Sequence, residues 1–373
     1  MLPNLLKIIA EPKQQDMSCS IIFSSQEISM FNVGIIGLGY VGEIHLRKFS
    51  GLPHVKIAAL ADTDPQRLSH FSSKYSDAKL FIDYSTLCAE ESLQLVVICL
   101  PNHLHAEACL AALNAGHHVL CEKPMAISVS SAEKMVATAI AKNRFLSVAM
   151  NFRWDFFGPD VFYVKKLIQD NELGKIYYVR IQYLRRVTFP VSGAQRWNLS
   201  KEKSGGGALI DLGPHMLDLG MWLVDNYEPL SVTGTVHNGL IQYAPVDDFA
   251  SGLIALKTGV AIQLEVAWSC HNEPLWQISV WGEKGGVMIN ALEPEGQRVV
   301  RYSHEGGEPV RLPITLNSEK WAEDDSLQAH VVNRMTTGNA ADCSADTALE
   351  VMRVIEAWYA SSDSQTSQLL GRR

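Results

Sequence analysis

The chain has 373 residues, of which 47% are hydrophobic and 19% charged, so it can bury a sizeable core and wholesale disorder is excluded. Lys and Arg number 32 against 40 Asp and Glu, and the resulting net charge of −8 argues against a general nucleic-acid binder. No run approaches the roughly 20 apolar residues of a membrane span, so we expect no membrane partner either. At about 150 residues per domain, the length indicates two domains.

Residues 1–30 carry no strong pattern. Their apolar pieces, Leu5–Ala10 and Ile21–Phe23, are short and interrupted by charges, unlike the core of a signal peptide. We expect a disordered N-terminal extension. The seven cysteines are odd in number and show no C-x-x-C spacing, which favours free thiols in a reducing compartment. The expected location is therefore the cytoplasm.

Residues 31–150 alternate between short apolar runs and longer amphipathic stretches. The predicted strands are Val33–Gly37, Val55–Ala61, Leu95–Leu100, His118–Cys121 and Phe145–Ala149. The predicted helices are Val41–Ser50, Pro65–Tyr75, His105–Ala115 and Ser128–Lys142. Apolar strands that alternate with helices predict an α/β domain with a doubly wound parallel sheet of the Rossmann type.

Residues 151–373 are patterned differently. A helix is predicted at Asp160–Asn171 and another at Ala345–Ala360. Between them, Lys175–Arg186 and Val260–Ser269 alternate apolar and polar residues, which indicates strands of an open, mostly antiparallel sheet in an α+β domain. The polar face of that sheet carries Gln263, Glu265, Gln277 and Trp281. Because such a face can pair with another subunit, we expect a homo-oligomer, a dimer or a tetramer.

The glycine motif G-x-G-x-x-G directly follows the first strand and opens a helix. It reads Gly37-Leu38-Gly39-Tyr40-Val41-Gly42. Glycines there permit a tight turn, and the helix N-terminus offers N–H groups to a pyrophosphate. Asp62 follows the second strand, where a carboxylate can accept hydrogen bonds from the hydroxyls of a ribose, so NAD is the favoured cofactor. The alternative role for Asp62 is a helix cap, but Asp64 is better placed for it. Arg67 nearby keeps NADP possible.

Two further segments follow strand ends at the same edge of the sheet, where ligands bind in open α/β folds. The residues expected to line the cofactor there are Leu100, Pro101, Asn102, His105, Glu122 and Lys123. Lys123 is also a candidate acid–base, because partial burial lowers the pKa of a lysine. A surface ion pair between Glu122 and Lys123 is the alternative. His103 and His105 have no matching ligand set, so no metal is expected.

A third cluster is Gly205-Gly206-Gly207, which precedes Asp211 and His215. Because proline is tolerated only near a helix start, Pro214 predicts a helix that begins near Gly213, with His215 in its first turn. Asp211 would then be close enough to hydrogen-bond His215 and raise its basicity. The alternatives are that His215 is a satisfied core histidine and that the glycines approach another backbone.

These motifs, in this order, resemble the glucose–fructose oxidoreductase / inositol dehydrogenase / rhizopine catabolism (Gfo/Idh/MocA) family. Pro101-Asn102-x-x-His105, Glu122-Lys123-Pro124 and Asp211-x-Gly-x-His215 carry the resemblance, and Leu100 departs from it where the family usually has Thr. The resemblance implies catalytic roles for Lys123, His215 and Asp211. Asn151-x-Arg153 is similar to the segment at the family's domain junction, which would place both side chains at the substrate cleft. Trp197 is a further candidate wall of that cleft.

The resulting hypothesis is an NAD(P)-dependent oxidoreductase that acts on a secondary hydroxyl of a sugar, a cyclitol or a derivative of either. His215 would take the hydroxyl proton while Lys123 hydrogen-bonds the oxygen. Two alternatives remain at this point. One is a glycosidase that retains its NAD, and the other is a sugar or nucleotide sensor that binds without reacting.

Overall fold

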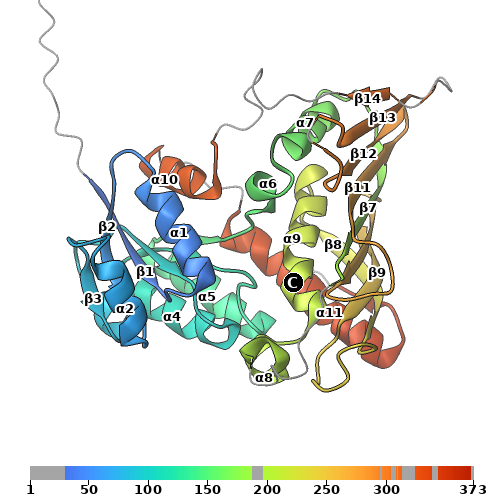
Figure 1. Cartoon of the computed structure of the whole chain (residues 1–373). Coiled ribbons are helices and arrows are strands. Elements are labelled where there is room, and N and C mark those ends of the chain that lie inside the picture. Colours follow the sequence, from blue (N-terminus) through green and yellow to red (C-terminus); the bar gives the residue numbers. More distant parts are fainter. Residues whose placement is uncertain are drawn as a thin grey trace, which may run out of the picture.

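A computed structural model describes residues 30–186, 196–294, 296–303, 308, 310–312, 324–337 and 343–370. It contains two sheets, with helices α9 (Ala208–Leu223) and α11 (Ala345–Ser364) between them (Figure 1). The first sheet is made of residues 31–148 and the second of residues 176–369. The described helices include none that is both long and apolar enough to cross a membrane.

The first sheet has six strands among the described residues, in the order β3-β2-β1-β4-β5-β6, all parallel. The strands are β1 (Phe31–Ile36), β2 (Val55–Ala61), β3 (Lys79–Phe81), β4 (Leu95–Ile98), β5 (His118–Cys121) and β6 (Leu146–Val148). The helices are α1 (Tyr40–Ser50), α2 (Pro65–Ser72), α3 (Tyr84–Cys88), α4 (Asn102–Asn114) and α5 (Val129–Lys142). The predicted doubly wound parallel sheet is confirmed. The pattern missed β3 and α3, which are too short to show a period.

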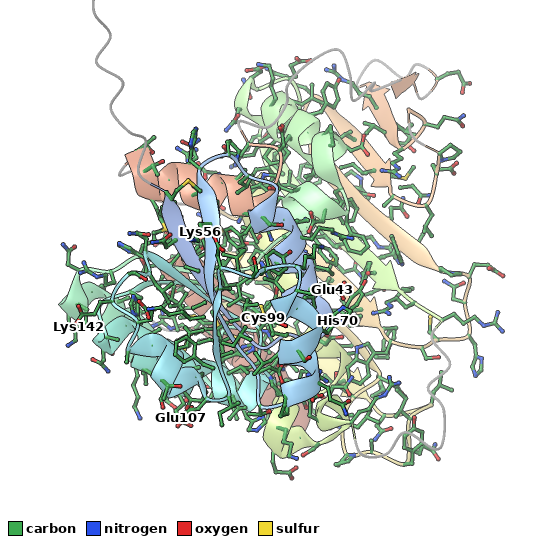
Figure 2. All side chains as sticks on the ribbon, turned by 60° about the vertical axis from the view of Figure 1, so that its left-hand side comes forward. Glu43, Lys56, His70, Cys99, Glu107 and Lys142 are labelled. Atoms are coloured by element: carbon green, nitrogen blue, oxygen red, sulfur yellow. The ribbon has the colours of Figure 1, made fainter. Side chains whose placement is uncertain are left out.

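The central strands are apolar because both of their faces are covered. Every residue of β4 is fully buried, as expected for a strand with helices on each side. Figure 2 shows the contrast with the surface: Glu107 of α4 and Lys142 of α5 lie on the outside, whereas Cys99, directly after β4, lies toward the middle of the molecule. Strand β4 therefore belongs to the covered core of the first sheet.

The second sheet has nine strands among the described residues, in the order β14-β13-β12-β11-β7-β10-β9-β8-β15. They are β7 (Ile176–Leu184), β8 (Pro229–His237), β9 (Phe249–Leu256), β10 (Ala261–Ala267), β11 (Leu275–Gly282), β12 (Gly285–Asn290), β13 (Val299–Ser303), β14 (Val310–Leu312) and β15 (Gln368–Leu369). Only β7 and β10 pair in parallel, so the predicted open and mostly antiparallel sheet is confirmed. Helix α9 packs on it so closely that a Cβ at Gly220 would lie 3.1 Å from Ile181 Cδ1.

The remaining helical segments all follow β6 in the chain. They are α6 (Phe152–Asp155), α7 (Gly158–Gln169), a 3-10 turn at Trp197–Leu199, α8 (Lys201–Ser204) and α10 (Leu327–Thr337). Helix α10 returns to the first sheet, where Gln328 Nε2 lies 3.0 Å from His45 Nδ1 of α1. The segment before α11 pairs with the edge of β6, through a bridge between Ser344 and Ser147. The C-terminal part of the chain thus covers both sheets.

Candidate active site

The loop between β1 and α1 combines two glycines that the fold requires with one that it does not. Gly37 has a φ of +89°, and a Cβ there would lie 2.3 Å from the carbonyl oxygen of Cys99. A Cβ at Gly42 would lie 1.9 Å from the oxygen of Gly37. At Gly39 the nearest described atom is Arg67 Nη1 at 3.9 Å, so the chain leaves space there. No described side chain caps α1, so its N-terminal N–H groups face this space.

Asp62 lies at the carboxyl end of β2, beside this loop. Its Oδ2 accepts a hydrogen bond from Leu38 N at 2.8 Å, and its Oδ1 accepts one from Asp64 N at 2.8 Å. Arg67 Nη1 is 3.4 Å from Asp62 Oδ2 and its side chain is half exposed. Asp64, rather than Asp62, caps α2 by accepting from Gln66 N. Since a carboxylate can accept about four hydrogen bonds, Asp62 retains capacity for a ribose.

Tyr40 and Val41 complete the loop, and both are exposed. Tyr40 is 81% exposed on the first turn of α1, with no described partner to hold it. The two side chains are therefore accessible to a bound molecule but contribute little to the core.

Lys123 connects the first sheet to helix α9. It follows β5, and its Nζ donates to the Oδ1 of Asp211 at 2.8 Å and to the backbone oxygen of Asp211 at 2.9 Å. Trp268 Nε1 donates to the other carboxylate oxygen at 2.7 Å. Burial by itself raises the pKa of Asp211, but Lys123 and Trp268 together bring that pKa below its ordinary value. Asp211 is thus an anion that holds the ammonium in place.

The imidazole of His215 lies one turn beyond Asp211 on α9, and it is 5% exposed. Its ring stacks on Phe152, with centroids 3.9 Å apart and planes 8° from parallel. Burial and, after it, the charge of Lys123 lower the pKa of His215 well below its ordinary value, although Asp211 opposes them. His215 is therefore neutral at physiological pH, as a general base must be.

The predicted hydrogen bond between Asp211 and His215 is absent from the described contacts. Lys123 and Trp268 occupy the two oxygens of Asp211, and the Nδ1 of His215 is buried with no hydrogen-bond partner among the described residues. The expectation was wrong because the sequence gives no sign that Trp268, on a distant strand end, reaches the carboxylate.

The predicted helix start near Gly213 was also wrong. Helix α9 begins at Ala208, so Asp211 lies in its first turn and Pro214 lies inside it. The reason is Asp247, whose carboxylate accepts from the amides of Gly207 and Leu209 at 2.8 Å each. A Cβ at Gly207 would lie 1.8 Å from the oxygen of Asp247. The missing side chain of Gly207 therefore makes room for the backbone of Asp247. Close approach of another backbone was one of the two alternatives stated for this cluster.

Glu122 is not a surface ion pair with Lys123. Its Oε1 lies 2.9 Å from His45 Nε2, and its Oε2 accepts from the backbone N of Lys123 at 3.1 Å. Burial would raise the pKa of Glu122, but His45 and then Lys123 lower it below its ordinary value. A buried chain of contacts from Gln328 through His45 and Glu122 thus reaches Lys123.

Two side chains that follow β4, Asn102 and His105, hydrogen-bond backbone carbonyl groups of nearby loops. Asn102 is buried and its Nδ2 donates to the oxygen of Ser204 at 2.9 Å. His105 is fully buried, with Nδ1 2.8 Å from the oxygen of Pro124 and Nε2 2.7 Å from that of Leu100. Burial opposes a charge on His105, yet Cys121 and these two carbonyls raise its pKa to about 9. Both ring nitrogens are used, so the expectation that His105 contacts the cofactor is not supported. Pro101 immediately precedes α4.

Arg153 does not line a cleft. Its side chain is 1% exposed, and it donates to Asp218 from Nε at 2.9 Å and from Nη2 at 2.7 Å. Tyr227 also bonds the pair. Arg153 was misassigned because a sequence cannot distinguish a guanidinium that anchors a helix from one that binds substrate. Asn151 is partly exposed and bonds Asp155.

Trp197 is 39% exposed in the 3-10 turn before α8. Its indole is accessible, in agreement with its predicted place in the wall of the substrate cleft, which stays a prediction.

Trp268 is the site residue that the sequence did not reveal, since its place in an apolar strand pattern indicated only a core position. Among the described residues, no group of three or more His, Cys, Asp or Glu side chains could hold a metal ion.

Two protein-family models match the chain. Residues 31–150 match the family model described as "Oxidoreductase family, NAD-binding Rossmann fold". Residues 161–288 match the model described as "GFO/IDH/MocA C-terminal domain".

Individual relatives cover most of the chain. Glucose-6-phosphate 3-dehydrogenase of Bacillus subtilis (strain 168) is 32% identical over 323 residues, 82% of this chain and 87% of that protein. D-glucoside 3-dehydrogenase of Escherichia coli (strain K12) is 26% identical over 363 residues, 92% of this chain and 98% of that protein. A solved structure of levoglucosan dehydrogenase with NADH has a TM-score of 0.81 at 22% identity, covering 92% of this chain and all of that one. At that identity the similarity shows the shared fold.

Proposed function

Because the chain belongs to the Gfo/Idh/MocA family of NAD-binding oxidoreductases, we propose that it transfers hydride between NAD and a secondary hydroxyl of a sugar ring. The observation that carries the proposal is the meeting of Lys123, from the first sheet, with Asp211 on α9, one turn before a neutral His215. An ammonium held by a carboxylate one helical turn from a neutral imidazole, at the carboxyl edge of a Rossmann sheet, suits the oxidation of an alcohol.

The residues of the first domain fit a dinucleotide. The open space at Gly39 and the uncapped N-terminus of α1 suit a pyrophosphate, and Asp62 suits the hydroxyls of the adenosine ribose. The nicotinamide supplies the hydride acceptor when NAD is bound. Since a carboxylate repels a 2′-phosphate, Asp62 favours NAD over NADP.

The chain's own residues handle the proton. His215, neutral because it is buried, accepts the proton of the sugar hydroxyl. Lys123 has three N–H donors, of which the described contacts use two, so one remains to hydrogen-bond the sugar oxygen. Asp211 and Trp268 keep the ammonium oriented while the charge on that oxygen changes. Acid–base assistance of this kind contributes on the order of 10² to 10⁴ in rate.

The names of the relatives suggest a position on the ring. Two of them are 3-dehydrogenases, one of a glucoside and one of a sugar phosphate. We therefore propose the hydroxyl at position 3 of a glucose-type ring as the first candidate.

A panel of substrates tests the function. Glucose, glucose 6-phosphate, methyl glucosides, levoglucosan and inositols are each incubated with NAD, and in parallel with NADP, while the absorbance of NADH or NADPH is followed. We expect net NADH from at least one glucose-type sugar. Cleavage of a glucoside without net NADH would favour a glycosidase that retains NAD. Binding of NAD with no turnover of any sugar in either direction would favour a sensor.

The assembly and location are proposals as well. The open face of the second sheet exposes Tyr177, Trp281 and Tyr302 around a hollow of about 530 Å³, which supports a homo-oligomer built on this face. Light scattering of the protein and of Trp281→Glu would test it, because a charge there should release monomers.

The described cysteines are all free thiols, which supports a reducing compartment such as the cytoplasm.

A further inference from the structure

Among the described residues, no hydrogen bond explains the orientation of His215. Its Nδ1 is buried with no partner among the described residues. The carboxylate of Asp211, the expected partner, is occupied by Lys123 and Trp268. A general base must nevertheless present its lone pair within hydrogen-bond reach of the proton that it takes. Some other contact must therefore fix the plane of the imidazole.

Phe152 makes that contact. Its ring lies almost parallel to the imidazole at a centroid distance of 3.9 Å and is itself 7% exposed. Phe156 packs against Phe152 with centroids 4.1 Å apart, and Tyr183 of β7 packs against its edge at 5.7 Å. The Phe152 ring thus has two aromatic neighbours besides His215.

The next residue secures the backbone of Phe152 to the same helix that carries His215. Arg153 forms two hydrogen bonds to Asp218, which lies three residues after His215 on α9. Residues 152 and 153 therefore contact α9 at two points one turn apart. Since the Arg153–Asp218 pair is buried, the spacing between the Phe152 ring and the His215 ring is closely determined.

We propose that Phe152 is the positioning residue for His215: its ring sets the imidazole plane and excludes water from one face, and the Arg153–Asp218 pair fixes Phe152 on α9. This inference rests on the proposed role of His215 as the base. It assigns to an aromatic ring the orienting part that carboxylates usually play for a histidine.

Water exclusion gives the proposal a measurable consequence. The charged groups facing His215 among the described residues are Lys123, which lowers its pKa, and Asp211, which raises it. The π face of Phe152 would by itself favour an imidazolium. The pKa of His215 is nevertheless lowered, with burial as the largest cause, so loss of the Phe152 ring should raise it.

The experiment compares Phe152→Leu with Phe156→Leu, the same substitution at two positions on neighbouring turns. The histidine ring carbons of the full chain are labelled with ¹³C, and the His215 signal is assigned by its absence from His215→Gln. For Phe152→Leu we expect the titration midpoint of His215 to rise toward the ordinary value of about 6.5. For Phe156→Leu, which leaves the stacked ring in place, we expect the midpoint of the unaltered protein. Phe152→Ala should raise the midpoint further.

Equal midpoints in the unaltered protein and in Phe152→Leu, or an equal rise in Phe156→Leu, would overturn the proposal. The titration needs no substrate, so it remains decisive even if the protein oxidises none of the sugars tested. On a sugar that is oxidised, Phe152→Leu should lower kcat by roughly tenfold or more with the KM for NAD unchanged, because misplacement of a catalytic group is costly. An unchanged kcat would equally refute a positioning role.

Discussion

Two pairs of a cation and a carboxylate connect α9 to residues that precede it in the chain, and they differ in exposure. Lys123 pairs with Asp211, and their side chains are 18% and 39% exposed. Arg153 pairs with Asp218, and both side chains are 1% exposed. The chemical groups are similar, the helix is the same, and the two carboxylates are two turns apart. The Lys123 ammonium therefore remains partly accessible, whereas the Arg153 guanidinium is enclosed by the protein.

The energetic consequences differ in the same way. A buried ion pair that loses one member leaves an uncompensated charge, which costs about 3–5 kcal/mol, whereas a solvated pair contributes about 1 kcal/mol or less. The Arg153–Asp218 pair should therefore matter for stability and the Lys123–Asp211 pair for chemistry. Substitutions at each pair test this assignment of one pair to stability and the other to chemistry.

Lys123→Met should have the largest effect on activity. It removes the proposed donor to the sugar oxygen, so we expect kcat to fall on the order of 10³-fold on a sugar that the unaltered protein oxidises. Binding of NAD, followed by quenching of tryptophan fluorescence, should persist, and urea unfolding should show a loss of about 1 kcal/mol or less. Turnover equal to that of the unaltered protein would remove Lys123 from the proposed site.

Asp218→Asn should produce the opposite profile. It preserves the shape of the side chain but leaves the buried Arg153 guanidinium uncompensated, so the free energy of unfolding should fall by about 3–5 kcal/mol. Its effect on kcat should be smaller than that of Lys123→Met, since the described hydrogen bonds of Asp218 go to Arg153 and Tyr227 and not to Lys123. Lys123→Met, measured in the same urea series, is the matched control. A stability loss as small as the control's would contradict the assignment of this pair as an anchor.

Much of the fold was predictable because it depends on local periodicity. Apolar strands alternating with helices indicated the parallel sheet, and alternation of apolar and polar residues indicated the second sheet. The start of α9 was not predictable, because Asp247, about 40 residues away, supplies its cap. Neither was the role of Trp268, whose indole N–H reaches Asp211 only after the second sheet has folded.

The two glycine motifs show the same limit within the candidate site. In the loop at residues 37–42, space at Gly39 remains open, as a ligand requires. In the run at 205–207, a Cβ at Gly206 would lie 2.1 Å from the hydroxyl oxygen of Tyr359. The two motifs look alike in the sequence, because a glycine indicates that some group approaches the backbone closely but does not identify that group. Only the structure distinguishes space for a ligand from space filled by the chain.

The smallest expected effect is the pH dependence of the stability that the Lys123–Asp211 pair contributes. The folded protein holds the pKa of Asp211 below its ordinary value of 3.8 because, although burial raises it, Lys123 and Trp268 lower it more. Between the two values the unfolded chain binds more protons than the folded one, so the stabilisation is complete above 3.8 and is lost as the pH falls through the depressed value. Urea unfolding measured from neutral pH down into acid should show the unaltered protein more stable than Lys123→Met near neutral pH, with the difference vanishing in acid. A difference that persisted unchanged in acid would mean that Lys123 stabilises the fold through its aliphatic chain rather than through the carboxylate of Asp211.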